Sequence, residues 1–239
     1  MQKYKFTGET KEVYGRTLHQ IVCVTAFASV AAGEVGGYIE KEVNLSQDGN
    51  AWVSGNAKVS GDAKVFGDAE VFGNAKVSGN AKVCGNAKVC GDAKVCGNAK
   101  VCGDAKVCGN AKVFGDANVS GDAKVFGNAK VFGDAWVFGD AEVCGDAEVF
   151  GNAILRRGST ETATDYIVIG PQGSRRSFAT LHLPSNTVCT GCFVGNLNEF
   201  KKAVYKNHNP DQGRVTFNNQ YQRVIRVFEF LQEQDKDAQ

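Results

Sequence analysis

The chain has 239 residues and a formal net charge of +1, with 22% charged and 43% hydrophobic residues. This balance argues against the bulk electrostatic attraction that holds many proteins on nucleic acids or on anionic membranes. No apolar run approaches the roughly 20 residues of a membrane-spanning helix, and the first residues lack the apolar core of a signal peptide, so we expect a cytoplasmic protein.

Residues 1–49 form the first predicted domain. Residues 3–7 and 18–24 are short alternating or β-branched runs, which predict two strands of a hairpin. Residues 33–40 and 43–45 keep a strand-like pattern without a regular spacing, and they predict degenerate coils of a solenoid. Because an open solenoid end exposes unpaired backbone, we expect this domain to be a β cap.

Residues 50–157 form the second predicted domain and repeat the hexapeptide Asn/Asp-Ala-Lys-Val-Ser/Phe/Cys-Gly eighteen times. In an extended strand, Ala and Val point to one side, and Lys and the fifth residue point to the other. Because lysine cannot fill a core, Ala and Val must face inward. Gly followed by Asn or Asp then makes each corner.

This pattern resembles the hexapeptide-repeat, left-handed parallel β-helices of the LpxA-like superfamily, in which a small residue follows an aliphatic one four positions later. Val53 and Ala57 are the first such pair, and the spacing holds throughout the repeat. The resemblance implies three hexapeptides per coil, and therefore about six coils of 18 residues. The expected fold is mainly β.

A coil of 18 residues sorts the outward residues into three faces, each with two rows. Face 1 carries Lys58, Lys76, Lys94, Lys112, Lys130 and Glu148 in its first row, and Ser60, Ser78, Cys96, Phe114, Phe132 and Phe150 in its second. Face 2 carries Trp52, Glu70, Lys88, Lys106, Lys124 and Glu142, with Cys90 and Cys108 in its second row. Face 3 carries Lys64, Lys82, Lys100, Asn118 and Trp136, with Cys84 and Cys102 in its second row.

Face 1 sets a row of lysines beside a row of phenylalanines, and two interpretations stay open. The phenylalanines could stack along the rod or pack against a second copy, which predicts a homo-oligomer. Alternatively, both rows could bind an anion with flat apolar groups, such as a nucleotide. The candidate binding residues on face 1 are Lys94, Lys112, Phe114, Lys130, Phe132 and Phe150.

Six of the nine cysteines occupy the fifth position of the repeat, where we interpret them as small hydrophobic residues in a reducing compartment. Stacked pairs such as Cys90 and Cys108 would have nearly parallel Cα–Cβ bonds, which is poor geometry for a disulfide. A flat row also lacks the four converging ligands of a zinc site.

The repeat contains no histidine. In the hexapeptide family, acyltransferases use a coil histidine as general base, and carbonic anhydrases bind zinc through three histidines. The resemblance therefore transfers no catalytic residue, and we expect neither enzyme activity nor a cofactor.

Residues 158–239 form the third predicted domain, a small α+β module. Three strands are expected at residues 165–170, 177–182 and 187–189. Asn196 followed by Glu199 predicts the capped start of one helix, and an apolar face predicts a second helix over residues 218–234.

Two features of this module are candidates for chemistry. Cys189 and Cys192 have the spacing of a metal-binding pair, but one pair is an incomplete zinc site that would need His182, His208 or a second chain. Arg175 and Arg176 form a basic loop that could bind a phosphate.

Two segments resemble known but uncharacterised proteins. Residues 1–80, with Gly36-Gly37-Tyr38-Ile39, resemble enterobacterial hexapeptide-repeat proteins of the YdcK type. The tail, with Gly191-Cys192-Phe193-Val194-Gly195, resembles a module attached to such repeats in phage and prophage genes.

From these features we expect a non-enzymatic, phage- or prophage-encoded solenoid that self-associates and presents its rod and C-terminal module to a host macromolecule. One alternative is a sponge that captures a nucleotide-type anion to evade host defence. Another is a degenerate acyltransferase, which acyl-coenzyme A binding would reveal.

Overall fold

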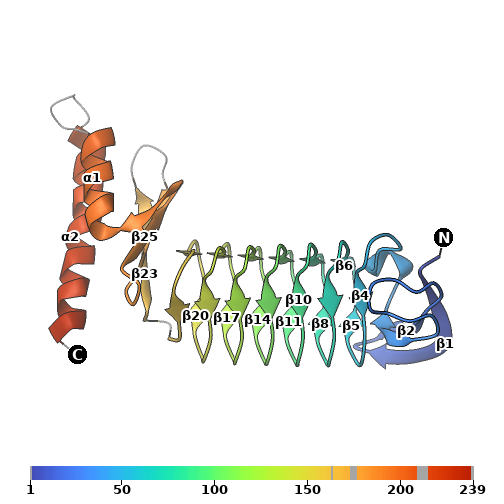
Figure 1. Cartoon of the computed structure of the whole chain (residues 1–239). Coiled ribbons are helices and arrows are strands. Elements are labelled where there is room, and N and C mark those ends of the chain that lie inside the picture. Colours follow the sequence, from blue (N-terminus) through green and yellow to red (C-terminus); the bar gives the residue numbers. More distant parts are fainter. Residues whose placement is uncertain (1, 163, 173–176, 209–214, 238–239) are drawn as a thin grey trace.

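The computed structural model describes residues 2–162, 164–172, 177–208 and 215–237. It shows an elongated molecule with a β cap at one end, a straight rod of stacked coils, and an α+β module at the other end (Figure 1). The repeat thus forms the long axis, and the two flanking segments lie at its ends.

The cap is built on a hairpin of β1 (Tyr4–Val13) and β2 (Arg16–Cys23), which confirms the predicted pair of strands. A two-residue turn at Tyr14 and Gly15, with φ angles of 53° and 72°, joins them. Strand β1 extends beyond the predicted residues 3–7. Its second half is polar and exposed, so the sequence shows no alternation of apolar and polar residues there that would predict a strand.

The cap is continuous with the rod. Strand β3 (Val35–Ile39) pairs antiparallel with β2 and parallel with β5, the first strand of face 1. The short 3₁₀ helix η1 (Glu42–Asn44) follows, and Asn44 Nδ2 donates a hydrogen bond of 2.8 Å to the carbonyl oxygen of Ala63. This segment continues the solenoid as predicted, but the strand-like pattern expected at residues 43–45 is wrong, because residues 42–44 form the 3₁₀ helix and only Leu45 makes a parallel bridge, to Val65.

The rod is a parallel β-solenoid with three sheets, one on each face, and neighbouring strands in a sheet are one coil apart. Face 1 contains β5 (Lys58–Val59), β8 (Lys76–Val77), β11 (Lys94–Val95), β14 (Lys112–Val113), β17 (Lys130–Val131) and β20 (Glu148–Val149). Face 2 contains β4 (Trp52–Val53), β7 (Glu70–Val71), β10 (Lys88–Val89), β13 (Lys106–Val107), β16 (Lys124–Val125), β19 (Glu142–Val143) and β22 (Ser159–Thr160). Face 3 contains β6 (Lys64–Val65), β9 (Lys82–Val83), β12 (Lys100–Val101), β15 (Asn118–Val119), β18 (Trp136–Val137) and β21 (Ile154–Leu155).

The predicted three faces are confirmed, and the fold is consistent with a left-handed β-helix. The solenoid has about seven turns of about 18 residues. This exceeds the six coils of the hexapeptides alone because β3 and β22, outside the repeat, pair with its first and last strands.

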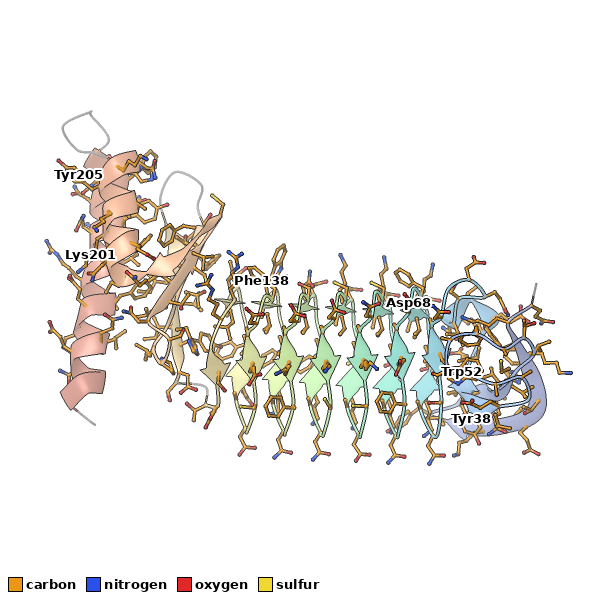
Figure 2. All side chains as sticks on the ribbon, viewed as in Figure 1. Tyr38, Trp52, Asp68, Phe138, Lys201 and Tyr205 are labelled. Atoms are coloured by element: carbon orange, nitrogen blue, oxygen red, sulfur yellow. The ribbon has the colours of Figure 1, made fainter. Side chains whose placement is uncertain are left out.

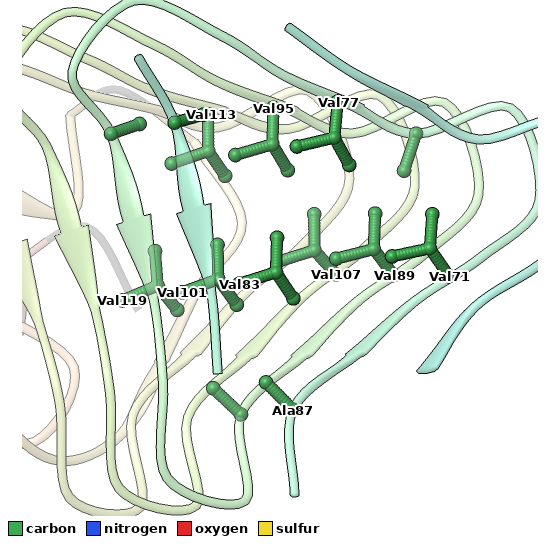
Figure 3. Packing of buried hydrophobic residues seen from close by; sticks show 14 of the residues in the cluster. Val71, Val77, Val83, Ala87, Val89, Val95, Val101, Val107, Val113 and Val119 are labelled. Atoms are coloured by element: carbon green, nitrogen blue, oxygen red, sulfur yellow. The ribbon is translucent and has the colours of Figure 1, made fainter. Parts of the chain in front are cut away.

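Valine and alanine fill the interior of the rod, as the repeat predicts. From Val53 to Val149 every valine of the hexapeptides is at most 1% exposed, and valines of successive coils stack in rows along the axis (Figure 3). The corners need glycine: Gly97 has φ +71°, and a Cβ atom there would lie 2.9 Å from the backbone nitrogen of Gly115 in the next coil. Each coil therefore packs directly on its neighbours.

The C-terminal module has a four-stranded antiparallel sheet and two helices. The sheet contains β23 (Tyr166–Gln172), β24 (Ser177–His182), β25 (Thr187–Thr190) and β26 (Phe193–Asn196), and the helices are α1 (Leu197–Asn207) and α2 (Val215–Asp237). The first three strands and both helices are confirmed. Strand β26 is not among the predicted strands; it has four residues, contains Gly195 and runs directly into the helix cap.

The capping box that begins α1 is also confirmed. The backbone nitrogen of Glu199 donates to Asn196 Oδ1, and the backbone nitrogen of Asn196 donates to Glu199 Oε2, both at 2.9 Å. Apolar residues of the sheet and of both helices form a core separate from that of the rod. This core includes Leu181, Val188, Phe200, Val224 and Phe228.

Side chains of the module's sheet satisfy backbone groups of the last coils. The Tyr166 hydroxyl donates to the carbonyl oxygen of Glu148 at 2.9 Å and accepts from the backbone nitrogen of Phe150 at 3.1 Å. Thr180 Oγ1 accepts from the backbone nitrogen of Ile154 at 3.0 Å. The module therefore covers the end of the rod opposite the cap.

Candidate functional site

Face 1 carries a continuous row of cations. Lys58, Lys76, Lys94, Lys112 and Lys130, which we call the lysine row, are direct partners on adjacent parallel strands. Adjacent strands lie about 4.8 Å apart. The row forms one side of an open groove of about 500 Å³, which is lined by Lys58, Asn74, Lys76, Asp92, Lys94, Asn110 and Lys112.

Most of the lysine row has no ion pair. Lys130 lies 2.5 Å from a carboxylate oxygen of Glu148, whereas no carboxylate of the described chain lies within ion-pair distance of the other four ammonium groups. Burial, together with the charges of Lys11 and Lys76, lowers the pKa of Lys58. Like charges on paired strands repel, so the row is a favourable place for an anion.

The cap extends this cationic surface. The Lys76 ammonium lies 5.6 Å from the ring centre of Tyr14 at the hairpin turn, and the Lys11 ammonium lies 4.8 Å from that of Tyr38. Tyr38, which pairs with Lys58, marks the end of the row next to the cap (Figure 2). Lys11 and Tyr14 could not be predicted as part of this surface, because the hairpin pattern does not indicate over which face the turn folds.

The other two faces have different charge patterns. On face 2, Glu70 pairs with Lys88 at 3.2 Å and Glu142 pairs with Lys124 at 2.5 Å, so its row is largely neutralised. On face 3, Asn118 and Trp136 follow three lysines. Face 1 is thus the most strongly cationic side of the rod.

The phenylalanines beside the lysine row stack on one another. The rings of Phe114 and Phe132 are 4.9 Å apart and nearly parallel, at 1°, and Phe150 continues the stack at 5.4 Å. Tyr166 of the module meets Phe150 edge to face at 6.4 Å. Because the rings cover each other's faces, the stack presents mainly ring edges to a partner. A binding role for Phe114, Phe132 and Phe150 stays a prediction.

The candidate residues of the C-terminal module lie apart from face 1. Cys189 is buried, and burial raises the pKa of its thiol to about 11. Cys192 is exposed and borders a cleft of about 450 Å³. That cleft is lined by Ser177, Thr190, Gly191, Cys192, Phe193, Phe200, Ala203, Val204, Asn207, His208 and Tyr221. Arg175 and Arg176, the predicted phosphate-binding pair, lie outside the described residues.

The three histidines occupy separate structural positions. His19 stacks on Phe6 at 4.8 Å, and His208 stacks on Tyr221 at 5.0 Å. His182 is 2% exposed and hydrogen-bonds to Ser185 and Ser159, and burial lowers its pKa. Among the described residues, no three His, Cys, Asp or Glu side chains are grouped so that they could hold a metal ion.

No protein-family model and no curated protein matches this sequence. No helix in the described part of the chain is both long enough and apolar enough to cross a bilayer.

Proposed function

We propose that this protein is a non-enzymatic solenoid that acts by binding, and that the lysine row docks on an acidic surface of a host macromolecule. The observation that supports the proposal is the run of four adjacent lysines that form no ion pair with any residue the structure describes, held in fixed register by the coils. An acidic partner would replace repulsion within the row by attraction across the interface. The resemblance of the tail to phage and prophage modules supports a host cell as the setting.

The proposal includes self-association, for which we favour face 3. Two copies that met through face 1 would oppose five lysines to five, which is unfavourable, whereas face 3 carries three lysines followed by Asn118 and Trp136. On face 3, Trp136 is 53% exposed and Phe66 is 40% exposed. Exposed aromatic side chains of this kind are typical of contact surfaces.

Self-association can be tested by light scattering. We expect Trp136→Ser to lower the molar mass in solution, whereas Phe132→Ser should leave it unchanged because Phe132 stacks within its own chain. A monomeric wild-type protein, or a mass change only in Phe132→Ser, would contradict the choice of face 3.

The binding proposal can be tested with a defined acidic polymer, poly-L-glutamate, on a sensor surface. Replacing Lys58, Lys76, Lys94 and Lys112 by glutamine should weaken binding at least tenfold, and added salt should weaken wild-type binding. The matched control replaces Lys64, Lys82, Lys100 and Lys106, which removes the same charge from the other faces. Equal loss in both variants would mean that total charge, not face 1, attracts the polymer.

A nucleotide ligand is the second candidate, and the groove beside the lysine row is the observation that favours it. Lysine and asparagine side chains, which are suitable donors for phosphate oxygens, make up most of the lining of this groove, and the carboxylate of Asp92, which repels phosphate, also borders it. Thermal-shift measurements with nucleoside mono-, di- and triphosphates would test it. If none of them stabilises the wild-type protein, the nucleotide hypothesis is wrong and the macromolecular partner remains.

A further inference from the structure

Four cysteines of the repeat form two pairs on the outside of the rod. Cys84 and Cys102 follow the paired residues Val83 and Val101 on face 3, and Cys90 and Cys108 occupy the same positions on face 2. All four side chains are half-buried. Each pair therefore holds two sulfur atoms next to each other on adjacent coils.

The register of the two cysteine pairs suits a bridging ion better than a disulfide. A disulfide requires Cβ atoms about 3.8 Å apart, with a twisted bond between the sulfur atoms. Adjacent strands lie about 4.8 Å apart. Side chains in the same rotamer on adjacent strands place their sulfur atoms one strand spacing apart, which is close to twice the zinc–sulfur bond of about 2.3 Å. An ion of similar size between two such sulfur atoms would need no movement of the coils.

The charges around the cysteines also favour a metal ion bound between two sulfur atoms. Two thiolates and one monovalent cation carry a net charge of −1, and Lys82 and Lys100 lie close enough to Cys84 to oppose it.

We propose that each cysteine pair binds one soft monovalent metal ion, of the Cu(I) class, through two sulfur atoms in a linear arrangement. Soft thiolate ligands select Cu(I), whereas zinc requires four converging ligands that a flat row does not supply. Binding converts two thiols and one cation into a bis-thiolate complex, and it releases two protons to solvent. No change in oxidation state is involved.

The test titrates reduced, full-length protein with Cu(I) without oxygen, in competition with a chelator of known affinity. Native mass spectrometry should find two chelator-resistant ions per chain, and ultraviolet absorbance should show sulfur-to-metal charge transfer. Because two protons leave, the apparent affinity should rise about 100-fold per pH unit below the thiol pKa.

Variants assign the ions to the pairs. Cys102→Ser should leave one ion, and the double variant Cys102→Ser with Cys108→Ser should leave none. Serine already occupies this position of the repeat at Ser54, Ser60, Ser78 and Ser120, so the coil tolerates it.

Cys96 is the matched control, because it has the same position in the repeat but lies between Ser78 and Phe114, without a partner thiol. Cys96→Ser should keep both ions. The proposal is wrong if no ion resists the chelator, if Cys96→Ser loses as much metal as Cys102→Ser, or if the ions are found only between two chains.

Discussion

The rod and the C-terminal module bury their side chains in different ways. In the rod every coil repeats the same small interior of alanine and valine, and each layer contacts only the layers beside it. The module packs larger and more varied residues, such as Phe200, Tyr221 and Phe228, between a sheet and two helices, and this packing borders a cleft. The interior of the rod is therefore uniform, and only its outward rows differ from coil to coil.

This difference has consequences for stability. In a solenoid the free energy of unfolding is approximately a sum over repeats and the contacts between neighbouring repeats. Both tryptophans, Trp52 and Trp136, lie in the rod, while the α-helices of the described chain lie in the module. Tryptophan fluorescence and helical circular dichroism can therefore follow the two regions separately during denaturation.

The largest expected effect comes from placing a charge inside the rod. Val101→Asp would bury a carboxylate without a partner in a layer where Val101 is fully buried. Such a change costs about 3–5 kcal/mol. Urea denaturation followed by tryptophan fluorescence would measure the loss. Lys100→Gln, at the adjacent outward position, is the control and should change stability by less than about 0.5 kcal/mol; similar losses in both variants would contradict the inward orientation of valine.

The next effect separates backbone strain from contact between coils. Gly97→Ala forces alanine into the left-handed region, which costs about 1–2 kcal/mol. It also places a methyl group 2.9 Å from Gly115. Gly151 has a similar φ, +63°, but nothing within 4 Å of its would-be Cβ. We therefore expect Gly151→Ala to lose less stability in urea than Gly97→Ala; equal losses would show that contact between coils contributes little.

A smaller effect is expected in the module. Asn196→Ala removes the side chain that caps α1, which costs about 1 kcal/mol. The helical transition, followed by circular dichroism, should move to lower urea concentration while the fluorescence transition stays in place. Equal movement of both transitions would show that the rod and the module unfold as one unit and do not have separate stabilities.

The last effect depends on pH and concerns the cap, where Lys3 is buried and donates to the carbonyl oxygen of Ala51 at 2.9 Å. Burial lowers the pKa of Lys3 from 10.5 to about 8, although the charges of Asp48 and Asp68 oppose this shift. Between these two pH values the unfolded chain binds more protons than the folded chain, so Lys3 favours folding increasingly as pH rises.

Comparison with Lys3→Met isolates this contribution. The melting temperature of the wild type relative to Lys3→Met should rise between pH 8 and pH 10.5. A constant difference across this range would mean that the buried ammonium keeps its ordinary pKa.

The periodic part of the molecule could be predicted from sequence because its contacts follow from one spacing. Once 18 residues make a coil, the period alone sets Lys94 against Lys112 and Cys84 against Cys102. The same argument fails where no period exists. Strand β26 is too short and too rich in glycine to give a signal, and the contact of Tyr14 with Lys76 depends on how the cap hairpin folds over face 1.

The candidate site was predictable to the same extent. The spacing was enough to predict the lysine row and the phenylalanine row beside it. The addition of Tyr166 to the aromatic stack required the docking of the module on the last coil, which is a contact between segments without a shared pattern.

Because the corner glycines and the filled interior fix the geometry of each coil, the number of hexapeptides sets both the length of the rod and the rotation of the C-terminal module relative to the cap. Inserting three hexapeptides would move the C-terminal module about 4.8 Å further from the cap and keep its direction. Inserting one would instead turn the module by a third of a revolution about the axis. Gain or loss of repeats can thus adjust both the reach and the orientation of the two ends without redesign of either.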